Sequence, residues 1–232
     1  MRRGERRAGR GTNHSKAVFV LAIGLVLSAV AAYHVAAQLE REARLKFDGE
    51  VSDAKSAIES RINAYADVLH GVRGLFISDN SVNRGEFKRY IDSLELNRRY
   101  PGIQVIHYSR RITDAERPAF EAMVRGDSSI SPGGYPGFAI RPAGIRPEYV
   151  VAQYVEPMAG NEQALGLDLG GDAVRLAALK RTRESGGITA SGTIALAHDP
   201  SRHPGFAMRM AIYRKDAPLA TAAERAAAFS GV

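Results

Sequence analysis

The chain has 232 residues, of which 45% are hydrophobic and 25% are charged, a composition that is typical of a folded protein and argues against disorder as its main state. Cysteine is absent, which excludes a disulfide framework and a thiolate metal site. The formal net charge of +7 does not indicate a nucleic-acid partner, because +5 of it lies in the first sixteen residues.

Residues 1–16 are rich in arginine and glycine and lack apolar periodicity, so we expect a disordered basic tail there. Residues 17–37 form an uncharged stretch of 21 residues, which at about 1.5 Å per residue is long enough to cross a hydrocarbon core of roughly 30 Å. A cleaved signal peptide is the alternative, because Val35, Ala36 and Ala37 suit a cleavage site. The apolar core of such peptides is usually about 7–15 residues long, which favours a retained transmembrane helix.

The basic tail also predicts how this helix is oriented. By the positive-inside rule, the arginines that precede the helix stay in the cytoplasm. We therefore expect a single-pass protein of the cell inner membrane, with the residues after Gln38 in the periplasm or outside the cell.

Apolar residues recur every three or four positions over residues 38–78, which predicts one continuous amphipathic stalk helix. Two interpretations of its apolar stripe stay open for the half near the membrane. The stripe packs in the core of the same chain, or it pairs with a second copy as a coiled coil and makes the protein a homodimer. Core packing is favoured for the residues past about 58.

The next segment begins with the pattern of a short helix. Ser81 and Asn83, followed by Glu86, supply the capping residues that open such a helix. A β-strand is expected from Ile103, because the residues alternate and are rich in β-branched and aromatic types. A helix capped by Thr113 follows it.

Short segments separated by glycine and proline come next, and their alternating residues predict the strands of an antiparallel sheet. One more helix is expected from Asp172 to Ser185, because Asp172 can cap it and apolar residues mark a buried side. That side carries Val174, Leu176, Ala177 and Leu179. The predicted fold class of residues 79–216 is α+β. Residues 217–232 are interpreted as a loop, a helical turn and the start of another strand, which belongs to a longer chain.

The sequence offers little support for catalysis. Motifs for nucleotide phosphates, for zinc and for a nucleophilic serine are absent from it. His198 and His203 stand on a proline-flanked loop whose spacing does not place two rings on one face, so we expect no metal site. The Gly170-Gly171-Asp172 triplet is similar to the opening of the diguanylate cyclase motif, but the residues after it do not continue that motif. We therefore expect no catalytic residue and no cofactor.

Two alternatives to a binding function stay open. Glu156 and Asp168 could act together in a secreted or anchored hydrolase, if their carboxyl groups lie about 5–10 Å apart in one cleft. A structural anchor without a ligand is the other alternative. It predicts that the protein's own side chains fill any pocket.

The segment from Tyr149 to Glu156 offers candidate binding residues. Regular alternation would place Tyr149 on one face of a strand, and Tyr154 and Glu156 together on the other. If this second face lines a pocket, Tyr154 can stack on a ligand and Glu156 can supply a charge or a hydrogen bond. For Asn161 and Asp168, capping of turns is the favoured alternative to ligand binding.

Four stretches resemble the CHASE domain, and the resemblance covers about residues 80–216. They are Tyr100–Ile103, Tyr149–Leu169, Arg175–Leu196 and Gly205–Arg214, and the run Glu156–Asp168 is the most specific part. The CHASE family consists of extracytoplasmic sensory modules that precede histidine kinases, diguanylate cyclases and related enzymes. The resemblance implies a long N-terminal helix followed by PAS-like subdomains, and Thr193 falls near a position where plant relatives contact cytokinins.

Together these patterns predict a membrane-anchored sensor module that performs no chemistry itself. It binds a small molecule outside the cell and passes the signal to a cytoplasmic output domain that is not part of this chain. The candidate ligand-binding residues are Tyr149, Tyr154, Glu156, Asn161, Asp168 and Thr193.

Overall fold

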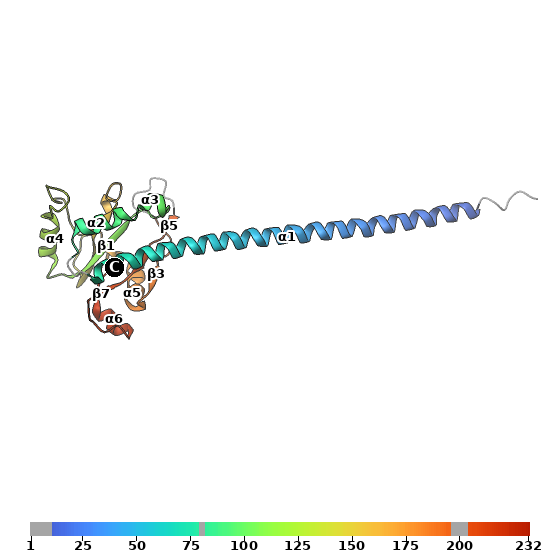
Figure 1. The fold of residues 1–232 in the computed structure, drawn as a ribbon. Coiled ribbons are helices and arrows are strands. Elements are labelled where there is room, and N and C mark those ends of the chain that lie inside the picture. The colour runs from blue at the N-terminus through green and yellow to red at the C-terminus, as the bar shows by residue number, and fades with distance from the viewer. Residues whose placement is uncertain (1–10, 79–81, 196–203) are drawn as a thin grey trace, which may run out of the picture. The chain divides into compact units, whose positions relative to one another are not determined.

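The computed structural model describes residues 11–78, 82–195 and 204–232, and it forms two compact units, Met1–Ser60 and Arg61–Val232. Most of the predicted basic tail, the capping residue Ser81 and the histidine pair His198 and His203 lie outside the described residues. The predictions for these positions therefore stay predictions. Figure 1 shows the order of the elements along the chain.

Helix α1 (Gly11–Ser78) contains all described residues of the first unit and continues into the second. Large apolar side chains in its N-terminal part, such as Val18, Leu27 and Leu45, are exposed. By length and composition, this is the one helix among the described residues that could cross a membrane. The prediction of a long N-terminal helix is confirmed.

The second unit is built around a four-stranded sheet with the order β2-β1-β8-β7. Its two long strands are β1 (Ile106–Thr113) and β2 (Glu148–Glu156), and the short strands are β7 (Ile212–Tyr213) and β8 (Phe229–Gly231). All the pairings are antiparallel. The predicted α+β class with an antiparallel sheet and flanking helices is confirmed.

The alternation predicted for β2 is interrupted by a β-bulge. Tyr154 pairs with Tyr108, whereas Ala152 pairs with the next residue, Ser109, so Gln153 is left without a partner residue on β1. The extra residue brings Tyr149, which pairs with Ile112, onto the same face as Tyr154. The prediction that Tyr149 lies on the opposite face was therefore wrong, because a pattern of alternation does not reveal one inserted residue.

Helix α2 (Arg84–Ser93) begins as predicted. The Asn83 side chain accepts the backbone N–H of Glu86, and the Glu86 carboxylate accepts the N–H of Asn83 in return, which forms a capping box. The four-residue helix α3 (Leu96–Arg99) follows it. Helix α4 (Arg117–Arg125) starts later than predicted, and Thr113 does not cap it. Thr113 ends β1 and donates to the carboxylate of Glu116 instead.

Helix α5 (Ala173–Ser185) is capped as predicted, because the Asp172 carboxylate accepts the N–H groups of Val174 and Arg175 at 3.0 Å. Of the four residues predicted on its buried side, only Leu179 is buried. Ala178, Leu179 and Thr182 are buried, whereas the other three apolar residues expected there are exposed: Val174, Leu176 and Ala177. The helix packs on the sheet through a narrow side, so its remaining apolar residues face away from the core.

The segment between β2 and α5 is one of the short segments predicted as strands, but it does not form a strand. It contains two short 3-10 helices, η1 (Glu162–Ala164) and η2 (Leu169–Gly171), and joins its neighbours through isolated bridges at Leu167 and Asp168. The remaining strands form two small ladders, which pair β3 (Ile188–Ala190) with β6 (Met208–Met210) and β4 (Ile194–Ala195) with β5 (Pro204–Gly205).

After β7 the chain forms helix α6 (Ala222–Ala228) and then β8, as predicted for its last residues. Strand β8 lies between β1 and β7, and it pairs with β1 at Arg110. The backbone of Val232 exchanges two hydrogen bonds with Ser109.

Three hydrophobic clusters hold the second unit together. The first joins Val68 and Val72 of α1 to Phe87 of α2 and to β1 and β2. The second packs α5 and α6 on one face of the sheet, and the third packs α4 on the other face. Burial of these apolar side chains stabilises the unit and fixes residues 61–78 of α1 against β1.

Candidate ligand-binding site

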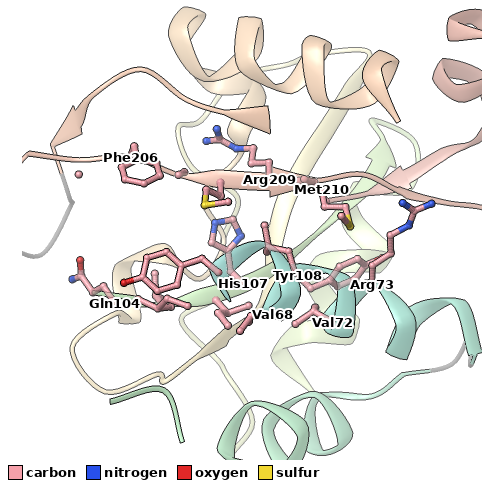
Figure 2. A pocket seen from close by; sticks show the side chains of 18 of the residues that line it. Val68, Val72, Arg73, Gln104, His107, Tyr108, Phe206, Arg209 and Met210 are labelled. Atoms are coloured by element: carbon pink, nitrogen blue, oxygen red, sulfur yellow. The ribbon is translucent and has the colours of Figure 1, made fainter. Parts of the chain in front are cut away.

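A cavity of about 400 Å³ lies between the last turns of α1, the start of β1 and the β5–β6 segment; we call it the β1–β6 cavity. Figure 2 shows Val68 and Val72 of α1 and Tyr108 of β1 on one side of it, and Met210 of β6 across from them. Most of its wall is apolar. Cavities of this size hold small organic ligands.

The position of the cavity follows from the strand pairing. Among the described strands, β6 pairs only with β3. The other edge of β6 and the start of β1 border the cavity. Lining side chains come from both faces of the sheet, since Tyr108 faces α1 while His107 faces the opposite side.

His107 is a neutral polar group in this cavity. Burial lowers its pKa to about 4, and the positive charges of Arg209 and Arg175 contribute in the same direction. Its Nδ1 atom lies 3.0 Å from the hydroxyl of Ser109. At neutral pH the ring is therefore uncharged and offers one donor or acceptor at its other nitrogen.

Arg209 of β6 is the second polar group, and it is 5% exposed. Its Nε and Nη1 atoms have no hydrogen-bond partner among the residues that the structure describes. Burial lowers its pKa, and so do the charges of Arg175 and Arg181 of α5. A buried cation without an anionic partner is costly, so this group is available for an anion.

Tyr154 and Glu156 share a face of β2, as predicted, but they lie outside the lining of the β1–β6 cavity. The Tyr154 hydroxyl donates to the carbonyl of Val82 at 3.0 Å, and burial raises its pKa. Glu156 is 4% exposed, and its carboxylate lies 3.9 Å from Nζ of Lys88. Burial raises the pKa of Glu156, and the charge of Lys88 opposes this effect.

Tyr149 and Asp168 are brought near each other by Arg146. The backbone N–H of Arg146 donates to the Tyr149 hydroxyl, and its Nη1 lies 3.3 Å from Oδ2 of Asp168. Asp168 is fully buried, and its Oδ1 accepts the N–H groups of Val150 and Gly170. Its Oδ2 has no hydrogen-bond partner among the described residues. This pair lies outside the cavity lining as well.

The other two candidates lie in turns. Asn161 is buried, and its Nδ2 donates to the carbonyl of Pro157 at 3.0 Å and lies 3.5 Å from the carbonyl of Gln104, which lines the cavity. Thr193 is exposed between β3 and β4. Ligand binding by the six predicted residues stays a prediction. The structure places them at several points around the sheet.

The hydrolase alternative needs Glu156 and Asp168 in one cleft. Asp168 binds the backbone at Val150, six residues before Glu156 on the same strand, which corresponds to about 20 Å at 3.3 Å per residue. The range for a pair of catalytic carboxyl groups is about 5–10 Å. This separation argues against the hydrolase. No cluster of metal-ligating side chains occurs among the described residues.

The sequence analysis did not select the residues that line the cavity. Arg209 carries the clearest signal, because it is the one charged residue in the otherwise apolar run from Gly205 to Tyr213. His107 gives no such signal, because its burial depends on β6 and α1, which are distant in sequence.

Comparison with protein families identifies one match, in which the model of the CHASE domain covers residues 80–232. A search of curated proteins found no match.

Proposed function

The chain belongs to the CHASE domain family, and on this premise we propose that it is a sensor module that binds a small molecule in the β1–β6 cavity. The family is one of extracytoplasmic sensory domains. The observation that carries the proposal is the cavity, which is open to an occupant of about 400 Å³. A purely structural anchor would fill this space with its own side chains.

The position of the cavity supports a mechanism for the signal. Val68, Val72 and Arg73 of α1 contribute to its wall, so an occupant contacts the helix directly. A ligand shifts a two-state equilibrium only through different affinities for the two states, and a difference of about 1.4 kcal/mol changes their ratio tenfold. Contacts to α1 supply such a difference if the helix shifts or rotates when the ligand binds.

We extend the proposal to the rest of α1. Residues 17–37 anchor the protein in the inner membrane, residues 38–58 pair with a second copy, and residues 79–232 lie in the periplasm. The apolar, exposed side chains of this part of the helix support the anchor. The output domain is a cytoplasmic enzyme such as a histidine kinase or a diguanylate cyclase. It receives the signal through the helix.

The test is a thermal-shift screen of metabolites on the full chain in detergent micelles, with a matched pair of variants. Met208 lines the cavity, whereas Met123 is an exposed residue of α4 outside it. A true ligand raises the Tm of the wild type in proportion to the logarithm of its concentration. Met208→Trp fills the cavity and abolishes this shift, and Met123→Trp retains it.

Two results would contradict the assignment of the ligand to the β1–β6 cavity. Retention of the shift by Met208→Trp would contradict binding in the β1–β6 cavity. Loss of the shift in Tyr154→Phe and Glu156→Gln, with Met208→Trp unaffected, would assign the ligand to the face of β2 next to α2. The matched variants therefore separate the cavity from the residues predicted from sequence.

A further inference from the structure

We propose that the ligand of the β1–β6 cavity is a small organic acid, whose carboxylate binds Arg209 and whose apolar body occupies the rest of the cavity. This inference rests on the proposed function, and it adds the chemical class of the ligand. It starts from a charge that the described structure leaves without a partner.

The strand pairing fixes where the guanidinium of Arg209 lies. Arg209 pairs with Thr189 in the β3–β6 ladder, so the two side chains share a face. The Thr189 hydroxyl contacts that of Thr182, which is buried in α5. Arg209 therefore faces α5, and Figure 2 shows it leaving β6 in the direction opposite to Met210.

A ligand in the cavity can reach this side of β6. The edge of β6 that borders the cavity pairs with no described strand, and both Arg209 and Met210 line the cavity. His107 of β1 also lines it and lies within electrostatic range of Arg209, which lowers its pKa. A ligand that reaches past this edge of β6 therefore meets a buried cation and a neutral imidazole.

Among the described residues, the charges that act on Arg209 are positive. The nearest charges that act on it are those of Arg175, which is half-buried, and Arg181, which is exposed. The structure shows no ion pair for any of the three arginines within the part of the chain that it describes. An anion is the group that such a site stabilises, and the planar guanidinium fits a carboxylate through two parallel hydrogen bonds.

The other arginine in the cavity wall is less suited to this role. Arg73 of α1 also has an Nε atom without a hydrogen-bond partner among the described residues, but it lies over the ring of Tyr213, 5.8 Å from the centroid. Arg73 is half-buried and lines the cavity together with apolar residues of α1 such as Val68 and Val72. Arg209 is the more deeply buried of the two, so it is the group that gains most from an anionic partner.

The other side chains of the cavity wall determine whether the rest of the ligand is polar or apolar. They are mainly aliphatic and sulfur-containing, with Val68, Val72, Ile106, Met208, Met210 and Ile212 among them. These residues favour an apolar body and disfavour a second charge. A monocarboxylic acid with an aromatic or aliphatic body supplies one anionic group for Arg209 and an apolar body for this wall, whereas inorganic phosphate supplies only the anionic group.

The experiment compares an acid with its uncharged amide. Phenylacetate, phenylacetamide and inorganic phosphate are titrated into the full chain in detergent micelles by calorimetry. We expect wild-type protein to bind phenylacetate at least tenfold more tightly than the amide. In Arg209→Met the two affinities fall within twofold of each other, and the control Arg89→Met, on the exposed side of α2, retains the preference.

Several outcomes overturn the inference. Equal affinity of the wild type for the acid and the amide, binding of neither compound, or tighter binding of phosphate would each contradict an organic acid on Arg209. A metabolite whose effect on the Tm is lost in Met208→Trp but unchanged in Arg209→Met would contradict it while the proposed function holds.

A second readout does not depend on the choice of probe. Because Arg209 is buried without a described partner, Arg209→Met is expected to raise the Tm of the ligand-free protein. A fall in the Tm would mean that Arg209 has a stabilising partner in the absence of ligand, and would overturn the inference.

Discussion

The neighbourhoods of two buried arginines differ in a way that separates structure from function. Arg84 of α2 is 1% exposed, its Nε donates to the carboxylate of Asp127 at 2.8 Å, and its guanidinium lies over the ring of Tyr135. Arg209 is almost as buried, but the described residues give it neither a carboxylate nor an aromatic ring. Both guanidinium groups have atoms without a hydrogen-bond partner among the described residues, Nη1 and Nη2 in Arg84 and Nε and Nη1 in Arg209. The difference is that the charge of Arg84 is paired with a carboxylate and an aromatic ring.

The largest effect is expected where the fold already satisfies the charge. Arg84→Met removes the partner of Asp127 and the contact with Tyr135, and we expect a loss of about 2–4 kcal/mol in the free energy of unfolding. Urea denaturation measures this loss. Arg89→Met on the exposed side of the same helix serves as control and should stay within about 0.5 kcal/mol of the wild type. A similar, small effect for both variants would contradict a stabilising role of the contacts that Arg84 makes with Asp127 and Tyr135.

His107, which lies near Arg209, is expected to make the stability of the protein depend on pH. Its pKa is about 4 in the folded protein and near 6.5 when unfolded, so the unfolded state binds the proton first as the pH falls. Stability is complete above about pH 6.5 and is lost between this value and pH 4, with a slope of up to about 1.4 kcal/mol per pH unit.

Unfolding curves measured from pH 7 to pH 4 test this prediction. His107→Gln is expected to flatten the slope in that range, and Arg209→Met to reduce it in part, because one of the charges that disfavour the protonated ring is removed. An unchanged slope in His107→Gln would show that other groups cause the pH dependence. His70 of α1, whose side chain is exposed, provides a control through His70→Gln.

Arg209→Met tests the other half of the comparison directly. Removal of a buried cation without a partner is expected to stabilise the ligand-free protein by about 1–2 kcal/mol, opposite in sign to Arg84→Met. Urea denaturation of both variants under one set of conditions gives the two signs. A loss of stability in both would make the two arginines equivalent and structural.

The smallest effect concerns a single backbone group. The N–H of Ser109 donates to the carbonyl of Val232, whereas the N–H of His107, which points to the same edge of β1, has no backbone acceptor among the described residues. We expect the His107 amide to exchange its proton faster than the Ser109 amide in the ligand-free protein. Hydrogen exchange by NMR measures the difference, and equal protection would mean that the edge is covered.

Local signals in the sequence predicted much of the fold. The capping box of Asn83 and Glu86 and the cap at Asp172 are formed by residues that are close in sequence, so their pattern defines the helix starts without tertiary contacts. The same reasoning failed for Thr113. This residue is the last one of β1, and α4 begins only after Glu116. The reasoning also failed for the face of Tyr149, because the bulge at Gln153 depends on pairing with β1.

The amino-acid sequence alone was therefore enough to predict the long N-terminal helix, the antiparallel α+β fold and, through its resemblance to the CHASE domain, the family to which the chain belongs. These features follow from periodicity and from short-range hydrogen bonds. The folded chain was needed to show that β1 and β6 border one cavity and that Nε and Nη1 of the buried Arg209 have no described hydrogen-bond partner. The reason is that burial and charge pairing depend on elements about a hundred residues apart, whose meeting no local pattern encodes.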